Sequence, residues 1–168
     1  EIYGINLWRR FCFDHIIPHA GGHALSPMLI QTTDEPGGIE NTCSTEERML
    51  AMIEGCREKE ILPDVWWIDA GWYPCPAGNW GPTGTWHADK ERFPRGLRPI
   101  SDRCAQYGCK LLVWFEPERV CPGTELALQH PDWLLYQKGE SRDNFSAAMP
   151  DLGNTSVCDG LAAIITHT

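Results

Sequence analysis

The sequence of 168 residues lacks any apolar run long enough to cross a membrane, and it lacks an excess of positive charge. Its longest apolar stretches, residues 110–115 and 161–165, fall far short of the roughly 20 residues that a bilayer span needs. It carries 14 Lys and Arg against 23 Asp and Glu, a net charge of −9, which would repel a polyphosphate. We therefore expect neither a membrane nor a nucleic acid as a partner.

Closely spaced cysteines are absent as well. The eight cysteines include no C-x-x-C pair, the spacing that usually marks zinc sites, so we expect no structural metal ion and no cofactor. Scattered thiols fit a reducing cytoplasm better than a disulfide scaffold, although the even count leaves room for bridges. The chain begins at Glu1 without a methionine and without a targeting pattern, so we expect position 1 to be a cut boundary.

What the sequence does contain is an alternation of helix and strand signals. Ser44 and Glu47 form a capping-box pattern, and apolar residues recur at helical spacing after it, which predicts a helix over residues 45–59. Residues 65–70 are rich in β-branched and aromatic side chains and stop at Gly71, as a buried strand does. Further helices are expected over residues 99–107 and 122–129 and after Asn154 or Thr155, and further strands over 28–31, 111–115 and 133–136.

This order of elements predicts a parallel α/β fold in which the helices supply the crossovers between strands. Between the second expected strand and its helix lie residues 71–98, which mix tryptophans with many glycines and prolines. Neither a helix nor a strand tolerates that mixture, and loops of this length in compact domains are usually functional. We therefore expect the site beside this loop.

Side-chain alternation selects candidate site residues at the ends of two strands. Trp67 and Asp69 share one face of the first strand, and Trp114 and Glu116 share a face at the end of the next. The carboxyl ends of parallel strands form the ligand site in βα barrels and in open α/β sheets. An indole and an acidic acceptor suit a sugar, which stacks its C–H face and donates from its hydroxyls. The alternative is structural: a carboxylate that accepts backbone N–H bonds or pairs with an arginine such as Arg119.

Five segments of the sequence occur together in one known family. The chain resembles the α-galactosidases of glycoside hydrolase family 36, the melibiase group, in which these segments appear in the same order. They are Trp-Ile-Asp-Ala-Gly-Trp-Tyr at 67–73, Gly-Thr-Trp at 84–86 with Arg-Phe-Pro-Arg-Gly-Leu-Arg-Pro-Ile at 92–100, Trp-Phe-Glu-Pro-Glu-Arg-Val at 114–120, His-Pro-Asp-Trp-Leu-Leu at 130–135 and Asp-Leu-Gly-Asn at 151–154. The likeness runs from about Ser44 to the end and is weaker over residues 1–40.

The resemblance implies a TIM-type barrel that hydrolyses terminal α-linked galactose by the retaining route, in which one carboxylate attacks and a second donates and accepts the proton. It implies that Asp69 hydrogen-bonds galactose hydroxyls and that Trp114 flanks the sugar ring. Trp72, Glu116 and Asn154 complete the substrate-binding set expected from the resemblance.

The sequence also departs from the family pattern. Ala70 stands where the family often has a second aspartate, which admits a substituted galactose. Asn154 stands where many members have an arginine, and it either binds sugar or caps the following helix. In the family both catalytic aspartates lie on later strands, so we expect no catalytic residue in this chain.

We therefore expect about half of a barrel, a single incomplete domain. Residues 1–40 would be a lead-in segment with the first strand, and residues 41–168 the first half of the glycosidase barrel. Such a piece should be inactive alone, and its open strand edges should lead to self-association or to docking with the remainder of the barrel. The alternatives are a non-catalytic carbohydrate-binding module and a structural half-barrel.

Overall fold

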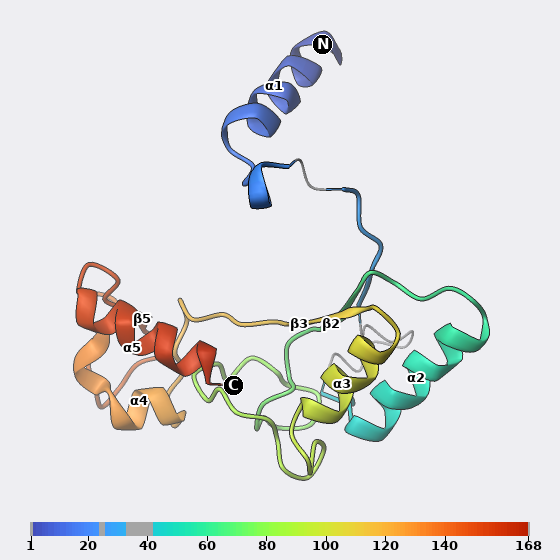
Figure 1. Ribbon diagram of the computed structural model, residues 1–168. Coiled ribbons are helices and arrows are strands. Elements are labelled where there is room, and N and C mark those ends of the chain that lie inside the picture. The colour runs from blue at the N-terminus through green and yellow to red at the C-terminus, as the bar shows by residue number, and fades with distance from the viewer. Residues whose placement is uncertain (1, 24–25, 33–41, 168) are drawn as a thin grey trace.

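The computed structural model describes residues 2–23, 26–32 and 42–167. Its centre is a parallel sheet of three strands in the order β1 (Ile30–Thr32), β2 (Val65–Ile68) and β3 (Lys110–Val113). Helix α2 (Glu46–Glu58) connects β1 to β2, and α3 (Arg98–Gln106) connects β2 to β3 (Figure 1). The predicted parallel α/β arrangement with crossover helices is confirmed.

The two crossover helices cover one face of the sheet with a single apolar core. Met49 and Ile53 of α2 and Ile100 of α3 join Trp66 and Ile68 of β2 in this core, and all five are at most 1% exposed. Alternation along β2 predicts this, because Trp66 and Ile68 must point to the same side. The opposite face of β2 carries Trp67, which is only partly buried.

The N-terminus of α2 differs from the prediction by one residue. Thr45, not Ser44, is the N-cap, and its Oγ1 accepts a hydrogen bond from the backbone N–H of Arg48 at 3.2 Å. Ser44 is buried beside it. A threonine directly after a serine offers two equivalent caps in the sequence, and only the backbone geometry distinguishes them.

Beyond β3 the chain forms a second, smaller unit with its own apolar cluster. Figure 1 shows it at the far end of the sheet from α2. The elements are α4 (Glu125–Gln129), the 3-10 turn η2 (Pro131–Trp133), the antiparallel pair β4 (Leu134–Leu135) and β5 (Met149–Pro150), and α5 (Thr155–Thr166). The buried side chains of the cluster are Val120, Leu126, Leu134, Ala148, Val157 and Leu161.

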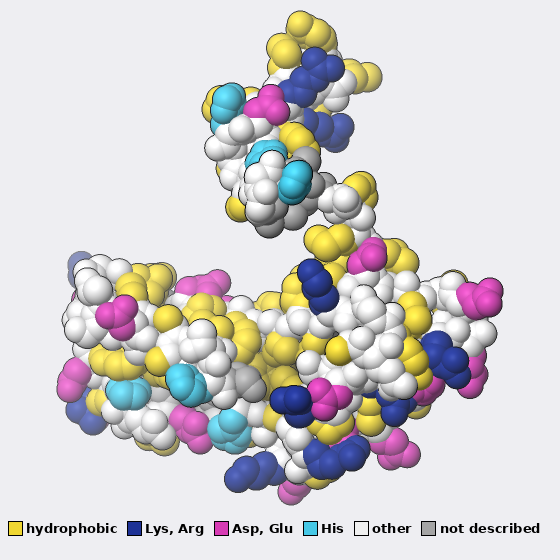
Figure 2. All heavy atoms as spheres, viewed as in Figure 1, with side chains coloured by type: hydrophobic (Ala, Val, Ile, Leu, Met, Phe, Trp, Pro, Cys, Tyr) yellow, Lys and Arg dark blue, Asp and Glu magenta, His cyan; other side chains and the backbone are white. Residues whose placement is uncertain are grey.

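The first helix, α1 (Ile2–His15), was not predicted, because residues 1–40 were expected to hold only a lead-in segment and a strand. It stands apart from the sheet (Figure 1), followed by the 3-10 turn η1 (Ala20–Gly22). None of its residues is buried, and Ile2, Tyr3 and Trp8 are more than 60% exposed. Figure 2 shows hydrophobic side chains on the surface of this segment. Its apolar residues surround the helix instead of lining one face, so the helical period was not evident in the sequence.

Two further properties follow from the described residues. None of the eight cysteines, all of which lie among the described residues, forms a disulfide bond. Along residues 2–23, 26–32 and 42–167, no helix combines the length and the apolar character that crossing a membrane requires.

Candidate active site

The site predicted from alternation depends on how β2 and β3 align. Their register sets Ile68 opposite Val113, and the backbone N–H of Trp114 donates to the carbonyl of Ile68 at 2.9 Å. The ladder thus extends one step beyond the strands. Asp69 follows β2 directly and Trp114 follows β3 directly. Alternation therefore puts both side chains on the face opposite Trp66. An indole and a carboxylate therefore occupy neighbouring positions at the carboxyl edge of the sheet.

Asp69 is partly buried, and its Oδ1 accepts the backbone N–H of Ala70 at 2.7 Å. A bond of this kind orients the carboxyl group relative to the backbone that leaves the strand. Ala70 itself is 3% exposed and lies in the core. The position where the family often has a second aspartate is thus filled here by a small buried side chain.

Trp114 lies among aromatic rings that come from the loop after β2. Its ring centroid is 5.6 Å from that of Trp80 at an interplanar angle of 80°, 6.5 Å from that of Tyr73 and 6.3 Å from that of Trp86. Tyr73 and Trp86 are buried, whereas Trp80 and Trp114 keep part of their surface exposed. Burial raises the pKa of Tyr73 well above its ordinary value, so its hydroxyl remains a proton donor.

Trp72 has no exposed surface. Its Nε1 donates to the backbone carbonyl of Trp114 at 2.8 Å, and its ring packs edge-on to Phe115 at 5.3 Å. This hydrogen bond joins the loop after β2 to the end of β3. The structure therefore places Trp72 beneath the candidate site, where it fixes the backbone of Trp114.

Glu116 lies three residues beyond the end of β3, so strand alternation does not determine its direction. Its carboxylate accepts two hydrogen bonds from Arg119, one from Nε and one from Nη2 at 2.6 Å. This pairing is the structural alternative considered from the sequence. Hydrogen bonding to Glu116 raises the pKa of Arg119 above its ordinary value, which keeps the guanidinium charged.

Asn154 is the N-cap of α5, and its Oδ1 accepts the backbone N–H of Ser156 at 3.0 Å. The capping role that the sequence allowed is thus observed. The side chain is exposed at the start of the helix.

Arg92 was missed from the sequence, although it lies in one of the five family segments. Its guanidinium donates to three backbone carbonyls: Gly71, Tyr73 at 2.8 Å and Thr42 at 3.2 Å. Two of them belong to the turn that follows Asp69. The sequence signal was the resemblance alone, because no local pattern indicates which carbonyls a distant arginine will reach.

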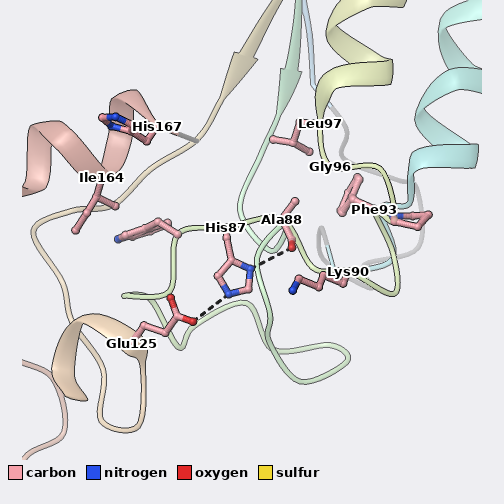
Figure 3. A pocket seen from close by; sticks show the side chains of 11 residues that line it. His87, Ala88, Lys90, Phe93, Gly96, Leu97, Glu125, Ile164 and His167 are labelled. Atoms are coloured by element: carbon pink, nitrogen blue, oxygen red, sulfur yellow. Dashed lines mark hydrogen bonds and ion pairs between the residues drawn. The ribbon is translucent and has the colours of Figure 1, made fainter. Parts of the chain in front are cut away.

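A cavity of about 730 Å³ lies beside the long loop that follows β2. Figure 3 shows it between the loop before α3, the start of α4 and the end of α5. His87 bridges its wall, with Nε2 3.1 Å from Glu125 Oε1 and Nδ1 3.2 Å from the carbonyl of Ala88 (Figure 3). Its lining includes neither Asp69 nor Trp114, but it includes Trp86, a ring neighbour of Trp114.

Comparison with known proteins decides the family. The family model described as Melibiase matches residues 7–168. The chain belongs to the melibiase family. It is 37% identical over 152 residues to α-galactosidase 2 of Pediococcus pentosaceus, covering 86% of this chain and 21% of that protein. It is 33% identical over 75 residues to the α-galactosidase of Escherichia coli, covering 45% and 11%.

Solved structures show the same fold in this family. The GH36 α-galactosidase AgaA from Geobacillus stearothermophilus superposes with a TM-score of 0.66 at 22% identity, over 84% of this chain and 19% of that one. The galactosidase domain of the α-galactosidase-sucrose kinase AgaSK gives 0.68 at 20%, over 93% and 21%. The melibiase-family chain thus spans about a fifth of these structures and of its first curated relative. Its three parallel strands and crossover helices form part of a TIM-type barrel.

Proposed function

We propose that this melibiase-family chain is part of a retaining glycoside hydrolase for terminal α-linked galactose, or a substituted galactose, and that it supplies substrate-binding side chains. The observation that carries the proposal is the register of β2 and β3, which sets Asp69 and Trp114 at neighbouring positions on one face. AgaA has been solved in complex with raffinose and with stachyose, and an α-galactosidase from Thermus thermophilus with p-nitrophenyl α-D-galactopyranoside. A galactoside is therefore the substrate we propose here.

The geometry supports different roles for the five candidate residues. Asp69 accepts hydrogen bonds from sugar hydroxyls, and Trp114 presents an indole to the C–H face of the ring. Trp72 acts through the backbone of Trp114, and Glu116 acts through Arg119. Asn154 uses its Oδ1 to cap α5, so its amide N–H₂ group is the part that would donate to a hydroxyl.

Catalysis by the retaining route needs two carboxyl groups about 5 Å apart, one of them free to attack. Of the two carboxylates at this edge, Asp69 accepts a backbone N–H and Glu116 is held in an ion pair. We propose that both catalytic aspartates come from outside residues 1–168, and that this chain alone does not hydrolyse galactosides.

Two other expectations also remain proposals. The outer edges of β1 and β3 have no strand beside them among the described residues, which supports self-association or docking with the remainder of a barrel. Eight cysteines without a disulfide bond among the described residues support a reducing compartment such as the cytoplasm.

Titration of the 168-residue chain with galactose and with glucose, followed by tryptophan fluorescence, tests the binding role. We expect a saturable change that is selective for galactose and that Asp69→Asn abolishes, because the amide replaces a charged acceptor. We expect no release of p-nitrophenol from p-nitrophenyl α-galactoside. Equal responses to both sugars would refute galactose recognition, and turnover by this chain would refute the absence of the catalytic pair.

A further inference from the structure

Trp80 is held in place more firmly than its position in a long irregular loop would suggest. Its backbone carbonyl accepts the hydroxyl of the buried Tyr73 at 2.7 Å. The carbonyl of the next residue, Gly81, accepts Nη1 of Arg119 at 2.7 Å. The guanidinium carbon of Arg119 also lies 5.5 Å from the centre of the Trp80 ring, within the range of a cation–π contact. One side chain from the same loop, Tyr73, and one from the segment after β3, Arg119, thus fix both the backbone and the ring.

Trp80 nevertheless remains partly exposed, and it lies beside Trp114, whose indole is also partly exposed. The two ring planes meet at 80° with centroids 5.6 Å apart. The remaining aromatic neighbours of Trp114, Tyr73 and Trp86, are buried beneath them. Two indoles at right angles therefore form an aromatic corner, defined as Trp80 and Trp114, next to the position of Asp69.

An aromatic corner of this kind suits a pyranose with one apolar face. The axial hydroxyl of galactose leaves a continuous patch of C–H groups on the opposite face of the ring. Such a patch stacks on one indole while the rim of the sugar meets the second, and aromatic rings favour both contacts. Hydroxyls at the other rim then remain available to a carboxylate acceptor.

The Glu116–Arg119 pair has a consistent place in this arrangement. The side chains of Arg119 and Glu116 are 31% and 18% exposed, so the pair is partly withdrawn from water and its desolvation is costly. Beyond Glu116 and Cys121, the Arg119 side chain contacts the Gly81 carbonyl and the Trp80 ring, which belong to the same loop segment. Glu116 orients the guanidinium, and the guanidinium orients Trp80.

We propose that Trp80 is a second aromatic contact for the sugar, at right angles to Trp114, and that Glu116 and Arg119 are positioning residues for it. The inference rests on the proposed function, because it assigns specificity within the same galactose site. It changes the role of Glu116 from a ligand of the sugar to a support of the aromatic corner.

Calorimetric titration of the 168-residue chain with galactose tests the contact. Trp80→Ala should weaken binding about tenfold, the effect of one lost aromatic contact, and Trp80→Phe should weaken it less. Trp8→Ala is the matched control, because Trp8 lies on α1 and is 62% exposed; it should bind like the wild type. If Trp80→Ala fails to fold by far-UV circular dichroism, Trp80→Phe decides, and wild-type affinity in that variant overturns the proposal.

The positioning role has its own measurement. Glu116→Gln should weaken galactose binding severalfold and reduce the near-UV circular dichroism of the coupled indoles. In a Trp80→Ala background, Glu116→Gln should have no further effect on the affinity for galactose, because Glu116 affects binding through the position of Trp80. If Glu116→Gln weakens galactose binding as much in the Trp80→Ala background as in the wild type, the positioning role is refuted.

Asp69→Asn separates this inference from the proposed function. If Asp69→Asn abolishes galactose binding while Trp80→Ala leaves it intact, the aromatic corner is refuted and the galactose site stands. If the wild-type chain itself shows no saturable binding, the proposed function fails and the inference fails with it.

Discussion

Replacement of Arg92 by alanine should be the most destabilising change of an arginine in the chain. Its guanidinium donates to the carbonyls of Gly71, Tyr73 and Thr42, and its side chain is only 17% exposed. A hydrogen bond from a charged donor contributes at least about 1 kcal/mol net, so loss of three costs about 3 kcal/mol. Water replaces the three lost hydrogen bonds poorly, because the Arg92 side chain is largely buried.

The assay is urea unfolding of the 168-residue chain followed by tryptophan fluorescence. With a denaturant slope of about 2 kcal/mol/M, a loss of about 3 kcal/mol lowers the unfolding midpoint by about 1.5 M. Arg98→Ala is the control, because Arg98 is 82% exposed and its ion pair is with Asp102 one helical turn away, a contact worth about 0.5 kcal/mol at most. If Arg92→Ala lowers the midpoint no more than Arg98→Ala, the three carbonyl contacts do not hold the loop as described.

Three further predictions concern the burial of Cys104 and the edges of the sheet. Burial raises the pKa of Cys104 from 9.0 to about 12, so iodoacetamide at about pH 8 should alkylate the more accessible Cys12 and leave Cys104 intact in the folded chain; rapid labelling of Cys104 would show that it is not enclosed. The raised pKa also implies stability that is complete below about pH 9 and is lost as the pH rises towards 12, which urea midpoints of wild type and Cys104→Ala across that range would reveal. The open edges of β1 and β3 should make the apparent mass in light scattering rise with concentration, and a constant monomer mass would contradict that expectation.

The core of the fold was predictable because its signals are local and repeat. Residues 65–70 combine β-branched and aromatic side chains with a glycine stop, and β2 lies at Val65–Ile68. The helix predicted over 99–107 is observed as Arg98–Gln106. Such elements are specified by periodicity and by turn residues within one window of the sequence. Helix α1 was not predicted, because its apolar residues do not lie on one face.

The candidate site was predictable only in part, for a physical reason. Strand register follows from alternation, so the common face of Asp69 and Trp114 could be expected. The partners of Glu116 and Arg92 depend on loops that converge from distant positions, and the reach of a long side chain has no sequence signature. The role of Trp80 is of the same kind, since it depends on an arginine 39 positions later in the sequence.

The isolation of α1 has a thermodynamic consequence. A helix of 14 residues with no buried side chain gains little from tertiary packing, and isolated helices of about this length are marginal in water. Its melting should therefore be gradual and independent of the cooperative transition of the sheet and its helices. We therefore expect α1 to unfold independently of the sheet and its helices, so that a stability measured for the barrel segment would not report on the N-terminal helix.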